Sequence, residues 1–225
     1  MATLDEVKNV FKDADAVCFD VDSTLIEDES IDELAKFCGV GDQVKELTNK
    51  AMGGQMSYKE TLEARLDLIK PSRDTMERFN KENPPRFTKG VEDLVRKLKS
   101  LGVAIYLVTG GFTSIVRSFA KVLGIPATNI FANKLLFDYD GNYVTFDDRE
   151  PTCSTGGKPR VMSILKERHG YKRLVMIGDG ATDMEACPPA DAFIGFGGNQ
   201  IRNKVQEGAK WFVTDFQELI AVLDS

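Results

Sequence analysis

The sequence predicts an α/β fold, with a Rossmann-like parallel sheet as its core and a helical cap inserted after the first strand. Short apolar runs bounded by turn residues alternate with helical patterns along most of the chain, which is typical of a parallel sheet covered on both faces. More than eighty residues separate the first apolar run from the second, and most of them have helical patterns. A single crossover needs far fewer residues, so this segment is expected to form a unit of its own.

The apolar runs expected to form the sheet are residues 16–21, 103–109, 174–178, 192–195 and 211–213. Residues 135–146 differ from them, because two alternating runs flank an Asp-Gly pair, Asp140 and Gly141. An Asp-Gly pair in this position is a strong hairpin signal. We therefore expect a small β-hairpin outside the main sheet.

The long insertion contains signals for helix starts and breaks. Residues 30–33 and 57–60 each have the Ser-x-x-Glu form of a capping box. Two glycines at 53–54 interrupt the helical pattern, and Asn-Pro-Pro at 83–85 is expected to return the chain to the sheet. The predicted division is a core domain of residues 1–24 and 85–225 and a helical cap domain of residues 25–84.

The composition limits the classes of function. The chain of 225 residues has a formal net charge of −6 and no basic stripe, so nucleic acid and membrane surfaces are not expected partners. The four scattered cysteines favour a reducing, cytoplasmic location. The single histidine, His169, cannot supply a Ser-His-Asp triad or a multi-histidine metal site, and it is expected near the end of a surface helix.

Two carboxylates follow the first predicted strand. Asp20 and Asp22 are two positions apart, so in an extended segment both side chains point the same way, at the strand end where open α/β sheets bind ligands. The functional interpretation makes Asp20 a nucleophile and Asp22 a general acid and base, whereas the alternative is an ordinary turn. Asp22 needs a raised pKa for that role, which nearby carboxylates favour and cations oppose, and the sequence leaves this balance open.

A second acidic motif follows the predicted strand at 174–178. It has the spacing of a dinucleotide fingerprint, but Asp183 occupies the third glycine position and Asp179 adds another negative charge. Mg²⁺ is bound by few carboxylates and keeps several waters. Asp20 and Asp179 are therefore a candidate magnesium site, with Asp183 just outside it. The alternative is a helix N-terminus with acidic residues in its first turn.

Two further segments provide groups for an anion. Thr109, Gly110 and Gly111 end the second strand before a helical pattern over residues 112–123, and a hydroxyl with unhindered amides at a helix start can cradle a phosphate. Lys158 follows two glycines, but its other neighbours do not match a nucleotide-binding loop. We interpret Lys158 as an ammonium group that reaches the phosphate; the alternative is a solvated lysine.

Together, and in this order, these motifs resemble the haloacid-dehalogenase superfamily of phosphatases. The matching residues are Asp20, Asp22 and Thr24 for its first motif, Thr109 for its second, Lys158 for its third, and Asp179 with Asp183 for its fourth. The similarity covers nearly the whole chain, including the inserted helices, which resemble that family's cap. The stretches AVCFDVDSTLI, ARLDLI and MIGDGATDMEACPPADAFIGFGGN are similar to the eukaryotic members that act on phosphoserine.

The resemblance implies roles for individual residues. The implied substrate contacts are Glu29, Met52, Gly53, Arg65, Thr109, Gly110, Gly111, Lys158 and Thr182. The implied magnesium ligands are Asp20, Asp179 and Asp22, the last through its carbonyl. Thr109 departs from the family, where Ser is common, and its extra methyl group narrows the site.

The residues of the insertion support part of this assignment. Arg65 falls within an apolar arc of its helical pattern and not among the acidic side chains. A ligand carboxylate would satisfy it, and so would an ion pair within the cap. Glu29 could bind a ligand ammonium, or it is a solvated residue near a helix start.

The resemblance implies magnesium-dependent hydrolysis of O-phosphoserine through an aspartyl phosphate, the last step of serine biosynthesis. One alternative is a related phosphatase for another small ester, such as a phosphocholine-like, nucleotide or sugar phosphate. A more distant alternative is an aspartate-phosphorylated signalling receiver, which the general base Asp22 argues against. The expected partner is a small phosphate ester, and a homodimer is left open.

Overall fold

The computed structural model describes residues 3–50 and 56–225. Its centre is a six-stranded sheet in the order β3-β2-β1-β6-β7-β8, in which every neighbouring pair is parallel. The strands are β1 (Ala16–Phe19), β2 (Ala104–Phe112), β3 (Ile130–Asn133), β6 (Leu174–Gly178), β7 (Ala192–Phe196) and β8 (Trp211–Val213). The predicted α/β fold is confirmed, and each of the five apolar runs forms a strand.

Two features of the sheet differ from the prediction. Strand β3 is not among the predicted strands, because it is short, partly exposed and lies at the edge of the sheet. Strand β2 continues beyond Thr109 to Phe112, since β3 pairs with this part of it. Gly110 and Gly111 therefore lie at the end of a strand, and the next helix begins only at Thr113.

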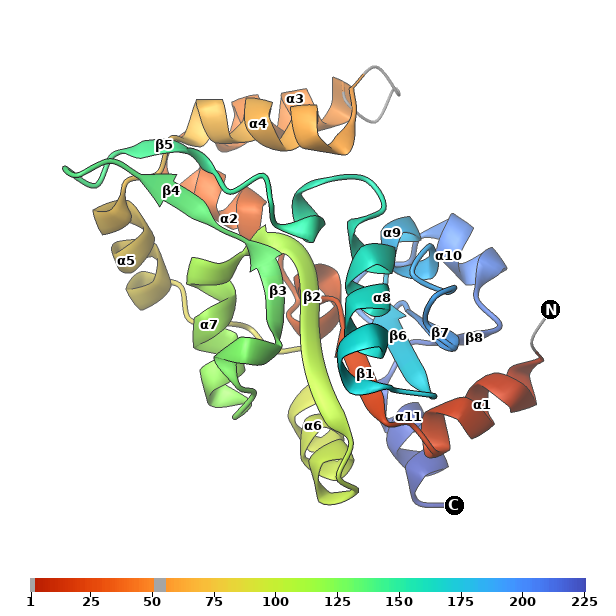
Figure 1. The fold of residues 1–225 in the computed structure, drawn as a ribbon. Coiled ribbons are helices and arrows are strands. Elements are labelled where there is room, and N and C mark those ends of the chain that lie inside the picture. The colour runs from red at the N-terminus through yellow and green to blue at the C-terminus, as the bar shows by residue number, and fades with distance from the viewer. Residues whose placement is uncertain (1–2, 51–55) are drawn as a thin grey trace.

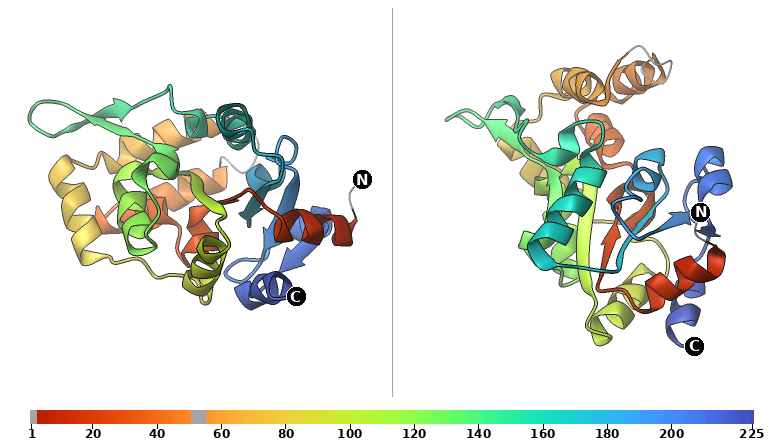
Figure 2. Two further views of the ribbon diagram at one scale, coloured as in Figure 1. Left: turned by 60° about the horizontal axis from the view of Figure 1, so that its bottom comes forward. Right: turned by 45° about the vertical axis from the view of Figure 1, so that its right-hand side comes forward.

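Alternate residues of each strand enter two separate cores, one on each face of the sheet. In β1, Val17 and Phe19 pack into one core, and Ala16 and Cys18 pack into the other. The helices of the first face are α1 (Leu4–Lys12), α6 (Val91–Ser100), α7 (Thr113–Val122) and α11 (Phe216–Leu223). Those of the second face are α8 (Gly157–His169), α9 (Ala181–Met184) and α10 (Asn203–Gly208) (Figure 2).

The chain between β1 and β2 forms the helices α2 (Ser30–Phe37), α3 (Gly41–Lys50), α4 (Tyr58–Ile69) and α5 (Arg73–Glu82). Figure 1 shows α3 and α4 above the sheet, at the end where β2 stops. The outgoing and returning segments lie side by side, because Ile26 and Phe87 form an antiparallel bridge and Asp28 pairs with Arg86. The inserted helices are thus placed over the strand ends, and the exact division into core and cap residues stays a prediction.

One of the two predicted capping boxes is correct. Ser57 accepts a hydrogen bond from the Glu60 amide, and the Glu60 carboxylate accepts one from the Ser57 amide, so α4 begins as expected. The box at Ser30 is wrong, because α2 has Glu29 at its N-cap position and no side-chain cap. The Ser30 hydroxyl is instead bonded to Asp22.

The predicted hairpin is confirmed as β4 (Leu135–Phe137) and β5 (Tyr143–Phe146), an antiparallel pair outside the main sheet. Gly141 in its turn has a φ of +86°, which glycine adopts without strain. His169 is the last residue of α8 and is exposed, as expected. Within residues 3–50 and 56–225, no helix has the length and apolar character needed to cross a bilayer.

Candidate active site

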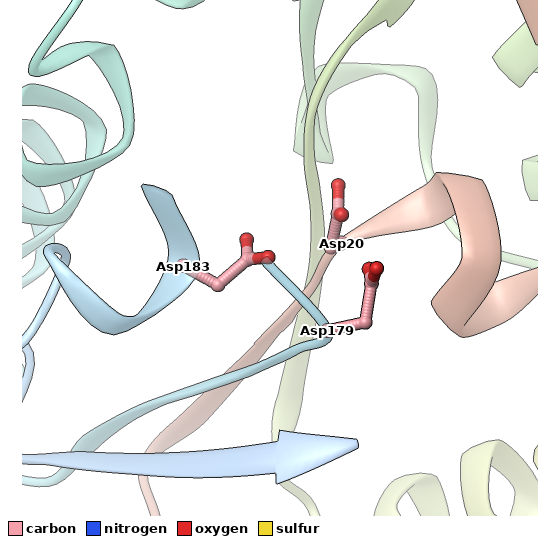
Figure 3. A group of neighbouring side chains, drawn as sticks. All are labelled: Asp20, Asp179 and Asp183. Carbon is pink, nitrogen blue, oxygen red and sulfur yellow. The ribbon is translucent and has the colours of Figure 1, made fainter. Parts of the chain in front are cut away.

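Three buried carboxylates meet where strands β1 and β6 end (Figure 3). The two strands are neighbours, with Phe19 opposite Ile177, so the residues that follow them leave the sheet side by side. Asp20 follows β1, Asp179 follows β6, and Asp183 lies in α9. Figure 3 shows the three side chains around one space, and each offers an oxygen that lies within 4.8 Å of the others. The juxtaposition of Asp20 and Asp179 expected from the sequence is therefore present.

Lys158 joins two members of this cluster. Its Nζ lies 2.8 Å from Asp20 Oδ1 and 2.5 Å from Asp183 Oδ1, and only 9% of its side chain is exposed. Burial alone would lower the pKa of Lys158, but Asp183 and Asp20 outweigh this effect and the net pKa is raised. Lys158 is a charged, buried partner of the cluster, so the alternative of a solvated lysine is wrong.

The carboxylates of Asp20 and Asp183 have different surroundings. Asp183 Oδ1 accepts a hydrogen bond from Lys158, and its Oδ2 accepts one from the Gly180 amide at 2.9 Å. A side chain on Gly178 would overlap the Asp183 carboxylate, so this close approach requires glycine. Both oxygens of Asp183 accept hydrogen bonds from the protein, and its place just outside a metal site stays a prediction. For Asp20, burial and then Asp183 raise the pKa, and Lys158 opposes them.

Asp22 is positioned by the start of helix α2. Its Oδ1 accepts hydrogen bonds from the Ser30 amide, at 2.8 Å, and from the Ser30 hydroxyl. Its Oδ2 faces Gly111, where an added Cβ would lie only 3.2 Å away. Burial raises the pKa of Asp22, and the bonds from Ser30 oppose this only in part. A raised pKa is what a general acid requires.

The turn that carries Asp22 is held in an uncommon conformation. Ser23 has a φ of +55°, which residues other than glycine seldom adopt. Asn199 supports the turn, since its Nδ2 lies 3.2 Å from the carbonyl oxygens of Ser23 and Ile26 and 2.6 Å from Thr88 Oγ1. This one amide group therefore contacts both segments that connect the inserted helices to the sheet.

The expected phosphate cradle lies at the end of β2. Thr109 is buried, and its Oγ1 accepts a hydrogen bond from the Gly111 amide at 2.9 Å. The Gly110 backbone carbonyl accepts a hydrogen bond from Asn133 Nδ2, and Asn133 Oδ1 accepts one from the Thr152 hydroxyl. The cradle is thus rigid, but the Gly111 amide is engaged by Thr109, so it is not the free donor that the sequence suggested.

Glu29 and Asp179 share one arginine. Arg202 Nε donates to Asp179 Oδ2 at 2.7 Å, and its Nη2 donates to Glu29 Oε1 at 3.2 Å. Ser23 also donates to Glu29, and Thr24 donates to Asp179. Burial, followed by the charge of Asp22, raises the pKa of Glu29 to about 7. Glu29 is half-buried and bonded, so its interpretation as a solvated residue is wrong.

The remaining predicted substrate contacts are less closely connected to this cluster. Arg65 lies on α4, and its buried Nε has no hydrogen-bond partner among the described residues. The alternative of an ion pair within the cap therefore finds no support there. Thr182 is exposed in the first turn of α9. Met52 and Gly53 lie outside the residues that the structure describes.

Several residues at the site have no role predicted from the sequence. Arg202 and Asn199 lie in the polar loop after β7, where no periodic pattern predicts which side chain turns inward. Asn133 belongs to the unpredicted strand β3. The sequence pattern places Tyr58 in the apolar arc of α4, but in the structure its hydroxyl and ring lie against Gly110.

Comparison with known proteins agrees with this geometry. The family model described as haloacid dehalogenase-like hydrolase matches residues 14–191. A protein of Bos taurus named phosphoserine phosphatase is 54% identical over 224 residues, which covers 100% of both chains.

Solved structures extend the comparison. The structure of DsGPDH of Dunaliella salina has a TM-score of 0.86 and 35% identity; the match covers 99% of this chain and 38% of that longer one. A structure described as a phospho-aspartyl intermediate analogue of phosphoserine phosphatase has a TM-score of 0.79 and 28% identity, over 92% and 98% of the two chains. The similarity thus extends over the sheet and the inserted helices.

Proposed function

Since the chain belongs to the haloacid dehalogenase-like hydrolases, we propose that it hydrolyses O-phosphoserine to serine and phosphate, with Mg²⁺ and through a phosphoryl group on Asp20. The observation that carries the proposal is the buried cluster of Asp20, Asp179, Asp183 and Lys158 at the strand ends. Full-length similarity to proteins named phosphoserine phosphatase supports the choice of substrate. The four free cysteine thiols support a reducing location such as the cytoplasm.

The donor groups of the cluster fit magnesium. They are carboxylate oxygens within 4.8 Å of one another, and hard divalent cations prefer such ligands. Asp20 and Asp179 would hold the ion, with the Asp22 carbonyl as the third protein ligand and Asp183 outside. When bound, Mg²⁺ neutralises charge on the phosphoryl oxygens and so lets one anion approach another.

Asp20 and Asp22 divide the first displacement between them. The Asp20 carboxylate attacks phosphorus, the bond from phosphorus to the ester oxygen breaks, and a phosphoryl-aspartate forms. Asp22 gives its proton to the departing oxygen, and its Oδ2 faces the cradle at Gly111 as this step requires. Lys158 contacts Asp20 and offsets negative charge during the attack.

The second displacement reverses the role of Asp22. A water molecule attacks the phosphoryl group on Asp20, and Asp22 takes the proton from that water. The bond from Asp20 to phosphorus then breaks, and phosphate leaves. A signalling receiver would retain the phosphoryl group, whereas a base at the position of Asp22 favours its rapid hydrolysis.

A panel of small phosphate esters, assayed with and without Mg²⁺, tests the proposed function. Phosphoserine should be hydrolysed best, and chelation of the metal should stop its turnover.

Arg65→Ala should lower kcat/KM for phosphoserine by roughly ten- to a hundredfold, because a charged hydrogen bond to the substrate carboxylate is lost. Phosphoethanolamine, which lacks the carboxylate, should be little affected.

The matched control is Arg149→Ala, which removes an arginine side chain that is 87% exposed. It should leave both esters unchanged. Equal losses on the two esters in Arg65→Ala would reject the carboxylate contact. Better turnover of a sugar, nucleotide or phosphocholine-like ester than of phosphoserine would replace the proposed substrate by that ester.

The raised pKa of Glu29 predicts a pH dependence that applies only to substrates with an amino group. Its pKa is raised to about 7, so the side chain is largely neutral below that pH and ionised above it. A ligand ammonium binds the ionised form. KM for phosphoserine is therefore expected to fall as the pH rises through about 7, more steeply than KM for its deamino analogue.

Phosphoserine and its deamino analogue carry the same phosphate group, so a comparison of their KM values cancels the effect of phosphate titration. Glu29→Gln should abolish the difference between their pH profiles. Parallel profiles in the unmodified protein would show that Glu29 does not bind the ammonium group.

A further inference from the structure

Tyr58, the first residue of helix α4, places its hydroxyl against the expected phosphate cradle. A Cβ built on Gly110 would overlap the Tyr58 hydroxyl oxygen and would lie 3.1 Å from Cζ. The polar end of the ring therefore lies directly over the backbone of Gly110. This contact connects the inserted helices to the end of β2, across the candidate active site.

The orientation of Tyr58 is unusual for a tyrosine. Such side chains normally keep the ring against apolar surface and the hydroxyl in water. Here 39% of the residue is exposed, but the hydroxyl end is the part packed onto Gly110. The capping box of Ser57 and Glu60 fixes the start of α4 and so the direction in which Tyr58 leaves it. A hydroxyl held inward in this way requires a polar partner.

The charged groups around the hydroxyl indicate what that partner is. Lys158, Asp20, Asp22 and Arg65 all lie close enough to influence the hydroxyl, so it faces the candidate active site. Burial raises the pKa of Tyr58 to about 12, so the hydroxyl keeps its proton and remains a donor in the physiological range. No hydrogen bond joins this hydroxyl to another of the described residues, so within that part of the chain its proton is not engaged.

We propose that the Tyr58 hydroxyl donates a hydrogen bond to a phosphate oxygen of the substrate, so that helix α4 supplies one wall of the phosphate site. The inference deepens the proposed function and rests on it. Phosphate is favoured over the substrate carboxylate, because Gly110 and Lys158 lie on the phosphate side whereas Arg65 is the expected carboxylate partner. A Cβ at position 110 would overlap the hydroxyl oxygen, so Tyr58 would have to move to admit any side chain there.

Equilibrium binding of inorganic phosphate to the full chain, with Mg²⁺ present, tests the contact without turnover. Tyr58→Phe keeps the ring and removes the donor, and it should weaken phosphate binding by about tenfold or more. The KM of the Tyr58→Phe protein should rise by a similar factor for phosphoserine and for phosphoethanolamine, because both carry the phosphate. Tyr139→Phe is the matched control, since Tyr139 is fully exposed in the hairpin turn and its loss should change nothing.

A second pair of variants tests the position of the hydroxyl. Gly110→Ala should lower kcat/KM on both esters, because the added methyl group overlaps the Tyr58 oxygen. Adding Tyr58→Phe removes the overlapping oxygen and leaves Cζ, 3.1 Å from the added Cβ, as the nearest atom. The double variant should therefore recover activity relative to Gly110→Ala alone. A double variant that is worse than Gly110→Ala would show that the hydroxyl does not lie over Gly110.

The outcomes separate this inference from the proposed function. Turnover of phosphoserine by the unmodified protein, together with phosphate binding that Tyr58→Phe leaves unchanged, would overturn the role of Tyr58 and leave the phosphatase intact. Phosphate binding that depends on Tyr58, in a protein that hydrolyses none of the esters, would keep the phosphate contact and overturn the phosphatase. A loss confined to phosphoserine would assign the hydroxyl to the carboxylate and reject the phosphate contact.

Discussion

The Asp20→Asn protein is expected to fold normally and to release no phosphate from any ester, with kcat reduced by roughly 10⁴-fold or more. Asparagine has nearly the shape of aspartate and can still accept the hydrogen bond from Lys158. Its amide is not a nucleophile, so the first displacement cannot occur. Phosphate release in a coupled assay gives the rate, and thermal unfolding checks the fold.

The same variant identifies the covalent intermediate. In the unmodified protein, acid quenching during turnover should trap a phosphoryl group on the peptide that contains Asp20, and Asp20→Asn should trap none. Asp140→Asn, in the exposed turn of the hairpin, is the matched control and should behave as the unmodified protein. Appreciable turnover by purified Asp20→Asn would end the assignment of Asp20 as nucleophile. A stable phosphoryl-protein without turnover would favour the signalling receiver.

The parts of the fold that were predicted correctly are those governed by local patterns. Buried parallel strands are continuous apolar runs, so β1, β6 and β7 were recognisable without any knowledge of their neighbours. The position of Asp20 beside Asp179 follows from topology, because parallel strands present their carboxyl ends at the same rim. Sequence patterns were therefore sufficient to predict that Asp20 and Asp179 lie side by side at the strand ends.

The features that were missed depend on tertiary contacts. Strand β3 is an edge strand whose four residues have weak periodicity, and its pairing is what extends β2 through Gly110. Ser30 has the sequence of a helix cap, but Asp22 accepts hydrogen bonds from both its amide and its hydroxyl, and Ser30 is the first residue of α2 with Glu29 at the cap position. Arg202 reaches Asp179 only because of the path of the loop after β7. None of these contacts is encoded in spacing alone.

Lys158→Met is expected to remove nearly all activity and also to destabilise the protein. Methionine preserves the length and volume of the side chain but leaves Asp20 and Asp183 without their buried cationic partner. Removing one partner from a buried ion pair costs about 3–5 kcal/mol of the free energy of unfolding. Chemical denaturation in a metal-free buffer measures this loss. Lys166→Met is the matched control on the same helix, because its pair with Asp191 is partly exposed and worth at most ~1 kcal/mol.

The loss of stability in Lys158→Met should depend on pH with a definite sign. Burial and mutual repulsion raise the pKa of Asp20 and Asp183 in the folded protein, and loss of Lys158 raises both pKa values further. The folded state then holds more protons than the unfolded state above a pH of about 4, so the free energy of unfolding falls as the pH rises. The difference from the unmodified protein should therefore be small in acid and large near neutral pH. A deficit that is the same at both would mean that the methionine acts through packing alone and that Lys158 does not neutralise the two carboxylates.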